Sequence, residues 1–135
     1  MTTKHTPTVL LSSDTLSGYG LDHIFEVAKT IGFDGIDLAT WKNYDAWNQK
    51  YVTKLSKTHN LPVRVIQVSS NLNTKEMEQA FDLCDDLDVK TISINAPSTF
   101  NFTSFNFITT NLQHYHKQKI QKNFAIINPE QKSII

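Results

Sequence analysis

Residues 21–40, LDHIFEVAKTIGFDGIDLAT, contain a helix, its end and the strand that follows it. Apolar side chains recur at i, i+3, i+4, i+7 and i+10 over residues 21–31, which predicts one buried face of an amphipathic helix. Gly32 stands where helices commonly end in a left-handed glycine, and Gly35 lets the chain turn tightly into a strand over 35–39. This stretch predicts one helix–strand unit of an α/β fold.

The same unit recurs along the rest of the chain. β-Branched and apolar runs predict further strands at 8–11, 63–68, 91–94 and 124–127, and helical periodicity predicts further helices over 45–58, 74–87 and 105–115. Strands separated by crossover helices are parallel, with right-handed connections. No linker or low-complexity tract divides the chain, so residues 1–135 are predicted to be a single domain or part of one.

Composition argues against several functional classes. Thirteen basic residues balance 13 acidic ones, so no whole-chain field attracts nucleic acid or an anionic membrane. The single cysteine, Cys84, cannot form an internal disulfide, which favours a reducing compartment. No apolar run approaches the roughly 20 residues of a membrane helix, and no signal peptide is recognisable. We expect a cytoplasmic protein without a membrane or nucleic-acid partner.

Two architectures share this β-α pattern. A five-stranded flavodoxin-like open sheet is complete at about this length, but it should end with a further helix packed on the sheet. Only eight residues follow Ile127, and they lack helical periodicity. A (β/α)₈ barrel, called a TIM barrel, typically needs about 250 residues. The predicted elements would then form a little over half of one.

A resemblance favours the barrel. The pattern from Ala28 to Leu38, Ala-x-x-x-Gly-Phe-Asp-Gly-Ile-Asp-Leu, resembles the first helix and second strand of the xylose isomerase-like TIM-barrel superfamily. That superfamily includes sugar isomerases, sugar epimerases and DNA-repair enzymes of the endonuclease IV type. The likeness is good over roughly residues 9–40 and continues as a strand–helix rhythm to about residue 128. It implies that residues 1–135 are the N-terminal part of such a barrel.

The resemblance also implies an activity, the isomerisation or epimerisation of a sugar or sugar phosphate. Many members of the superfamily bind a divalent metal, and an oxygen-rich ligand set would suit Mg²⁺ or Mn²⁺. Their first metal-binding Glu usually ends the fifth strand, where this sequence has Ile127, and Glu130 lies beyond a proline. We therefore predict no metal site and no cofactor in this chain, and assign no catalytic residue. The chain is interpreted as truncated, and the incomplete site leaves open whether it is an active enzyme.

Polar residues at the predicted strand ends are the candidate substrate-binding residues, because barrel enzymes keep their chemistry at that rim. They are Asp14, Asp37, Gln67 and Asn95. Trp41 follows the second strand and could stack on a sugar ring. The ordinary alternatives are a helix-start loop for Asp14 and a structural turn for Asn95. Trp47 falls on the predicted helical face and is expected in the core.

Two other functions stay open. An isolated half-barrel exposes two parallel sheet edges, so a non-catalytic half-barrel that self-associates would protect both. A flavodoxin-like module that binds a small ligand would instead be a stable monomer. The partners we expect are therefore a small-molecule sugar and, for a half-barrel, a second copy of the chain.

Overall fold

The structure is a computed structural model that describes residues 6–41, 43–69, 74–95 and 123–127, the last segment by its backbone alone. The described strands form one parallel sheet in the order β1-β2-β3-β4-β5. Their bounds are β1 (Leu10–Ser12), β2 (Gly35–Ala39), β3 (Val63–Val68), β4 (Thr91–Asn95) and β5 (Asn123–Ile127). The predicted α/β fold of parallel β-α repeats is confirmed for this part of the chain.

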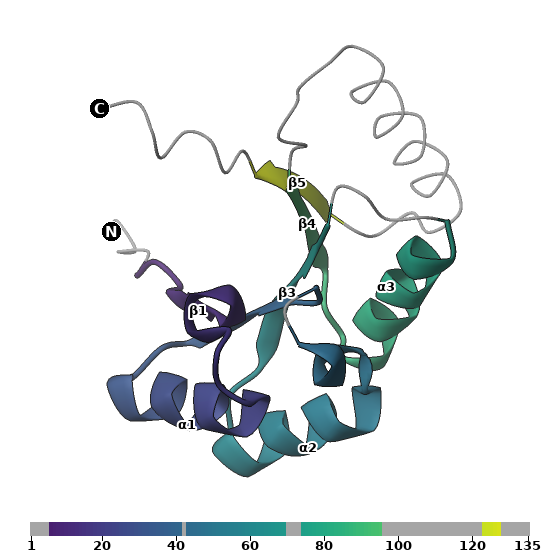
Figure 1. The fold of residues 1–135 in the computed structure, drawn as a ribbon. Helices are drawn as coiled ribbons and strands as arrows, with labels where there is room; N and C mark the ends of the chain where they lie inside the picture. Colours follow the sequence, from purple (N-terminus) through teal and green to yellow (C-terminus); the bar gives the residue numbers. More distant parts are fainter. Residues whose placement is uncertain (1–5, 42, 70–73, 96–122, 128–135) are drawn as a thin grey trace.

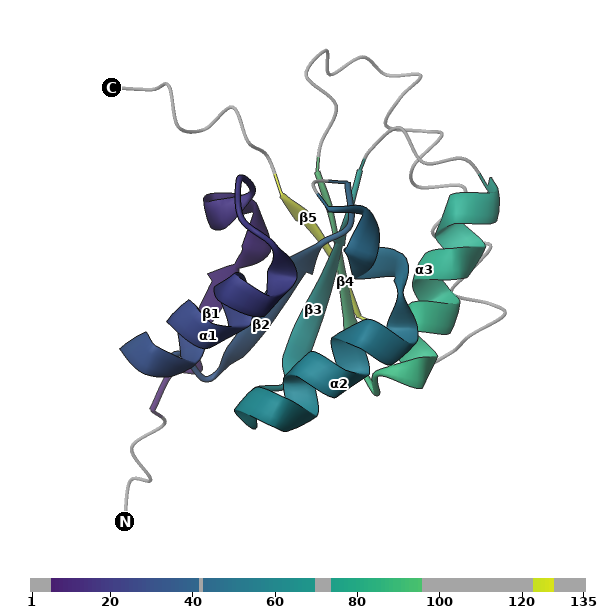
Figure 2. The same cartoon turned by 60° about the horizontal axis from the view of Figure 1, so that its bottom comes forward.

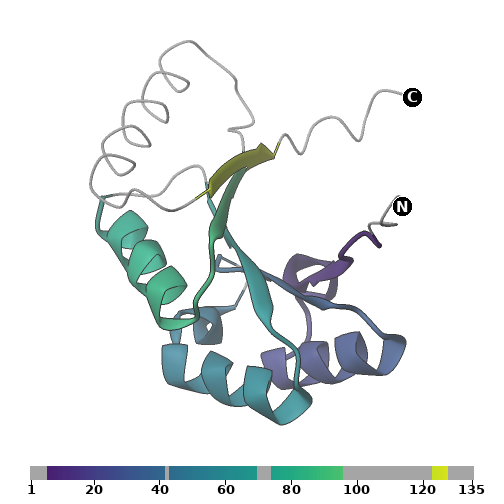
Figure 3. The same cartoon turned by 180° about the vertical axis from the view of Figure 1, so that it is seen from behind.

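Three α-helices are described, and all three lie on the same face of the sheet (Figures 1 and 2). Their bounds are α1 (Leu21–Ile31), α2 (Gln49–His59) and α3 (Thr74–Asp86), and two short 3₁₀ helices are η1 (Ser13–Leu16) and η2 (Tyr44–Trp47). The view from behind shows the strands curving past these helices (Figure 3). The helix predicted over 105–115 and the turn at Asn128–Pro129–Glu130 lie outside the described residues.

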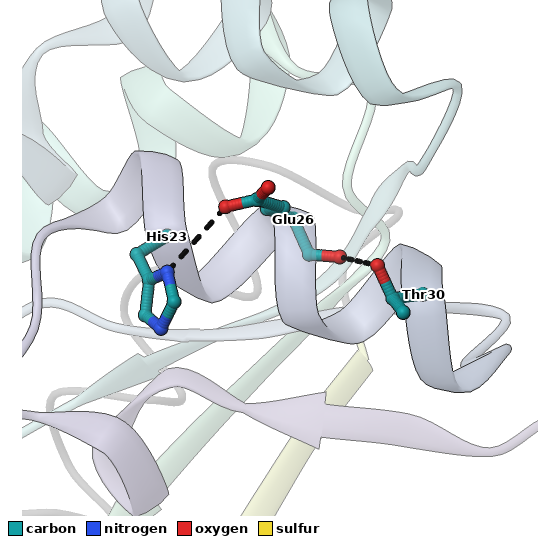
Figure 4. Close-up of polar contacts among 3 residues, drawn as sticks. All are labelled: His23, Glu26 and Thr30. Atoms are coloured by element: carbon teal, nitrogen blue, oxygen red, sulfur yellow. Dashed lines mark hydrogen bonds and ion pairs between the residues drawn. The ribbon is translucent and has the colours of Figure 1, made fainter.

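Helix α1 follows the predicted pattern closely. Its buried side chains include Leu21, Phe25 and Ala28, and it ends at Gly32, whose φ of 100° is the left-handed conformation that favours glycine. The solvent face of α1 is polar. There, His23 Nδ1 lies 3.4 Å from a Glu26 carboxylate oxygen, and the Thr30 hydroxyl donates to the Glu26 carbonyl oxygen (Figure 4). Both His23 and Glu26 are exposed, so we read these contacts as helix-surface interactions.

Helix α2 begins later than predicted, at Gln49 rather than Asp45. Asn48 is extended, and its side chain caps the helix by accepting a hydrogen bond from the Tyr51 backbone N–H at 3.2 Å. Trp47 therefore lies in η2 rather than on α2, and it packs against the core from there. The prediction that Trp47 belongs to the α2 face is wrong, because a cap separates it from that helix.

The helix-covered face of the sheet forms the core. In a parallel sheet, paired residues point to the same side, and the row Leu38–Ile66–Ile92 is fully buried beneath the helices. Buried residues of the helices complete this apolar cluster, among them Phe25 and Phe81. Cys84 lies in the same cluster, as predicted from its helical face.

An irregularity in β3 decides which of its side chains reach the core. Ile36 pairs with Val63, but the next residue, Asp37, pairs with Val65, so Arg64 is an extra residue at a β-bulge. Val63 and Ile66 both enter the helix-covered cluster as a result. Beyond the bulge, Val65 and Gln67 point to the opposite face.

That opposite face carries the polar side chains of the strands. The row Ser12–Asp37–Val65–Thr91 crosses it first, and the row Ala39–Gln67–Ser93 lies nearer the carboxyl ends of the strands. No described helix covers this face (Figures 1 and 3). Among the described helices, none combines the length and apolar character needed to cross a membrane.

Candidate functional site

The candidate site lies on the sheet face that no described helix covers, in the middle of β2 and β4 and near the carboxyl end of β3. Its centre is Asp37, whose Oδ2 atom accepts a hydrogen bond from Gln67 Nε2 at 3.4 Å. The other carboxylate oxygen, Oδ1, is buried and has no hydrogen-bond partner among the described residues. Buried polar atoms are normally paired, so this oxygen is an acceptor that the local structure leaves unused.

The main chain of β3 at Gln67 is bonded to the residue that follows β2. The Gln67 backbone carbonyl oxygen accepts hydrogen bonds from both the backbone N–H and the hydroxyl of Thr40, each at 3.0 Å. Thr40 directly follows β2, so the two bonds fasten the end of β2 to β3. Gln67 is 7% exposed, and its amide therefore meets Asp37 in a site with little water.

The loop after β1 brings a second carboxylate to the site. Ser13 is buried, and its hydroxyl oxygen accepts a hydrogen bond from the Ala39 N–H at 2.8 Å, which ties η1 to the end of β2. Asp14 is the next residue in η1 and is half-buried. Its charge acts directly on Asp37.

Burial raises the pKa of Asp37 from 3.8 to about 6, and the nearby Asp14 carboxylate contributes to the same shift. Both causes disfavour the ionised form, the first by removing water and the second by like-charge repulsion. A carboxyl group that titrates close to neutral pH can both accept and return a proton under ordinary conditions.

A second unpaired group lies two strands away. Ser93 is 2% exposed, and its hydroxyl oxygen has no hydrogen-bond partner among the described residues. It is level with Gln67 in the sheet register, on the same face. We call Asp37, Gln67 and Ser93 the polar row. It runs diagonally across three adjacent strands, because Asp37 pairs with Val65 and not with Gln67. Among the described residues, the oxygen at each end of it has no hydrogen-bond partner.

The structure brings three of the five predicted site residues together, namely Asp14, Asp37 and Gln67. Trp41 lies at the same end of β2, half-buried in the turn after Thr40. Asn95 is the last residue of β4, beside Ile127 in the register, and the position of its side chain lies outside the description.

Sequence reasoning missed Ser13, Thr40 and Ser93. Ser93 had a readable signal, because Thr91-Ile92-Ser93-Ile94 alternates polar and apolar residues, and that period of two places Ser93 on the polar face. Ser13 makes one hydrogen bond and Thr40 makes two to residues far away in the sequence, and no local pattern predicts such contacts.

Among the described residues, no group of three or more histidine, cysteine, aspartate or glutamate side chains could hold a metal ion.

A separate hollow of about 180 Å³ lies between η2, the start of α2 and α3. Its lining comprises Trp47, Gln49, Gln79, Asp82, Leu83 and Asp86, and it shares no residue with the polar row.

The polar row can therefore accept hydrogen bonds from an uncharged, hydroxyl-bearing ligand and can exchange a proton at Asp37.

Comparison of the chain with protein-family models and with curated proteins gives no match.

Proposed function

We propose that the chain forms about half of a barrel of the xylose isomerase-like kind and binds a sugar or related polyol at the carboxyl ends of its strands. Sequential strand order supports this architecture, because a doubly wound sheet reverses its order at one point and carries helices on both faces. In a TIM barrel each strand neighbours the next and the helices form the outer layer. The placement of α1, α2 and α3 on one face is of that kind.

The observation that carries the proposed binding function is the buried Asp37 Oδ1 in the middle of β2, which has no hydrogen-bond partner among the described residues. Ligands of α/β proteins bind at the carboxyl ends of parallel strands. A ligand hydroxyl that donates to Oδ1 would remove the cost of an unpaired buried acceptor, which is about 1–3 kcal/mol. A second hydroxyl could bond Ser93 at the other end of the polar row.

The spacing of the row indicates the size of the ligand. Neighbouring strands lie about 4.8 Å apart and residues rise about 3.3 Å along a strand, so the diagonal from Asp37 to Ser93 spans about 12 Å. A ligand with several hydroxyl groups along a chain or ring suits this length. A ligand with a single polar group would satisfy only one end.

Chemical-shift mapping tests this proposal. The full chain labelled with ¹⁵N is titrated with the ketopentose D-xylulose as the probe, and the amide signals of Asp37, Gln67 and Ser93 are expected to shift together. Ser93→Ala should weaken binding about 2- to 13-fold, the usual range for one lost hydrogen bond of about 0.5–1.5 kcal/mol.

Thr53 supplies a matched control. Its hydroxyl oxygen is also buried without a partner among the described residues, but it lies on α2, away from the polar row. Thr53→Val should leave D-xylulose binding unchanged. Equal losses in both variants, or shifts confined to residues outside the polar row, would count against the proposed site.

We also propose that the half-barrel self-associates through its sheet edges. Within the described part of the chain, β1 pairs only with β2 and so forms one edge of the sheet. Val9, just before β1, is 52% exposed. A second copy could cover this edge and its apolar neighbour, because unpaired parallel edges attract further strands.

A further inference from the structure

We infer that the hollow between η2, the start of α2 and α3 is a second binding site, and that its ligand is a guanidinium group carried on a short alkyl chain. The hollow lies among the helices and shares no residue with the polar row. Binding there is therefore independent of the proposed function, and the two can be tested separately.

The hollow is small and has apolar surface on two sides. Its volume is about 180 Å³, which is below the roughly 300–1,000 Å³ of sites for drug-sized ligands. It therefore suits one functional group and a few carbon atoms. Trp47 lines it from η2 and is half-buried, and Leu83 lines it from α3 and is buried. The indole ring and the leucine side chain can contact the flat face and the alkyl chain of such a ligand.

Two carboxylates line the hollow from α3. Asp82 and Asp86 are exposed and stand at i and i+4, so they project from the same face of the helix. Like charges at this spacing repel each other, and the partial negative charge at the C-terminal end of a helix disfavours further acidic groups. Residues 83–86, the last turn of α3, include no basic residue that would offset these charges. A cation bound in the hollow would reduce both unfavourable interactions.

The combination of groups favours a guanidinium over other cations. A planar guanidinium can stack on an indole ring and can donate two parallel hydrogen bonds to one carboxylate. Gln49 and Gln79 also line the hollow, and their side-chain carbonyl oxygens can accept hydrogen bonds from the remaining N–H groups. An ammonium group has no plane to stack on the ring, and a metal ion gains nothing from the apolar surface of Leu83.

An NMR titration tests the assignment. The full chain labelled with ¹⁵N is titrated with n-butylguanidinium, and the indole N–H signal of Trp47 is expected to shift until the site is saturated. The indole signal of Trp41, which does not line the hollow, should stay in place. The uncharged n-butylurea has nearly the same shape and should bind about 5-fold more weakly or worse, because it forms neither the ion pairs nor the cation–π contact.

Two neighbouring aspartates of α3 give a matched pair of variants. Asp86→Asn removes a charge that lines the hollow and should weaken n-butylguanidinium binding about 2- to 5-fold, the range for an exposed ion pair. Asp85→Asn removes the same charge from an exposed residue that does not line the hollow, and it should leave the affinity nearly unchanged. Asp86→Asn removes an acidic group from a helix C-terminus, so urea unfolding should show no loss of stability.

The source of the guanidinium group is distinguished by a further probe. Nα-acetyl-arginine methylamide carries the same group on a peptide backbone. Binding as tight as that of n-butylguanidinium supports the site and identifies a peptide arginine as a ligand. Weaker binding of this probe supports a site for a free small molecule.

Three results would overturn the inference. Equal affinities for n-butylguanidinium and n-butylurea would show that charge is not recognised. Equal weakening by Asp86→Asn and Asp85→Asn would show a general effect of the negative charge of α3 rather than a built site. A Trp47 signal that does not shift would show that the hollow stays empty. None of these results bears on the polar row, which the D-xylulose titration tests by itself.

Discussion

Asp37 has one carboxylate oxygen bonded to Gln67, a second oxygen without a hydrogen-bond partner among the described residues, and a like charge, Asp14, that acts on it. Its pKa of about 6 in the folded protein exceeds its ordinary value of 3.8, so the folded state binds more protons between those two pH values. Stability therefore falls as the pH rises through this window, and the full loss persists above it.

Replacing Asp37 with Asn should remove this pH-dependent loss. The shift of about two pKa units corresponds at most to about 3 kcal/mol, and the side chain is only half-buried, so Asp37→Asn should stabilise the protein by about 1–2 kcal/mol at pH 7.5. At pH 4 the same substitution should change stability much less. Urea unfolding at both pH values measures the difference, and an equal effect at both would contradict it.

Ser13 and Ser93 offer a comparison between two buried hydroxyls. Ser13 is 3% exposed and accepts from the Ala39 N–H, whereas Ser93 is 2% exposed and unpaired among the described residues. Ser13→Ala would leave the Ala39 N–H without its hydrogen-bond partner and should lower the free energy of unfolding by about 1–2 kcal/mol. Ser93→Ala should be neutral or stabilising by up to about 1 kcal/mol. Thermal unfolding of both variants checks the contrast, and a larger loss for Ser93→Ala would refute it.

At the scale of single residues, the sequence indicates Asp37 and Gln67 as candidate site residues, because both are polar residues near the predicted ends of apolar strands. It does not indicate the hydrogen bond between them. That contact depends on the extra residue Arg64 in β3, which sets how far Gln67 extends past Asp37. Val63 to Val68 reads as an uninterrupted strand, so nothing local predicts the bulge.

The elements themselves follow the sequence more closely. β2 and β3 have the predicted bounds, and α1 ends at the predicted glycine. α2 does not begin where predicted. The hydrophobic periodicity extends through Trp47, whereas the cap at Asn48 places the start of the helix at Gln49. Capping depends on the backbone conformation of one residue, which hydrophobic periodicity does not report.

Gly35, at the start of β2, lies close against the residues around the bulge in β3. A Cβ atom there would lie 2.7 Å from the Pro62 carbonyl oxygen and 2.9 Å from Arg64 Cγ. The Pro62 oxygen is backbone and accepts from the Ile36 N–H, so it cannot move freely.

Gly35→Ala is therefore expected to destabilise the protein by about 1–3 kcal/mol, the usual range for overpacking. Gly18 provides the matched control, because a Cβ atom there would meet nothing within 4 Å. Gly18→Ala should change stability by less than about 0.5 kcal/mol. Chemical denaturation of both variants measures the difference, and equal stabilities would show that the close approach at Gly35 is not a constraint.

For the whole molecule, the sequence predicts parallel strands and crossover helices but allows both an open sheet and a barrel. The two architectures differ in strand order and in the face of the sheet that each helix covers. Neither property can be predicted from the pattern of a single β-α unit. The observed order β1-β2-β3-β4-β5, with the described helices on one face, supports our half-barrel proposal (Figure 1).

If the half-barrel proposal holds, the chain should associate through its edges. Size-exclusion chromatography with light scattering at micromolar concentration should give a dimer or larger species. Val9→Lys places a charge beside the β1 edge, at an exposed position, and should shift the equilibrium towards monomer. A wild-type chain that is monomeric at all accessible concentrations would contradict the proposed self-association.

The central claim concerns the carboxyl group of Asp37, on the sheet face that no described helix covers. One of its oxygens has no hydrogen-bond partner among the described residues, and its pKa suits proton transfer. The most direct measurement is a ¹³C NMR titration of the Asp37 carboxyl carbon in the wild-type chain and in Asp14→Asn. The account predicts a midpoint of about 6 in the wild type and a lower midpoint in the variant. A wild-type midpoint near the ordinary value of 3.8, unchanged by Asp14→Asn, would contradict it.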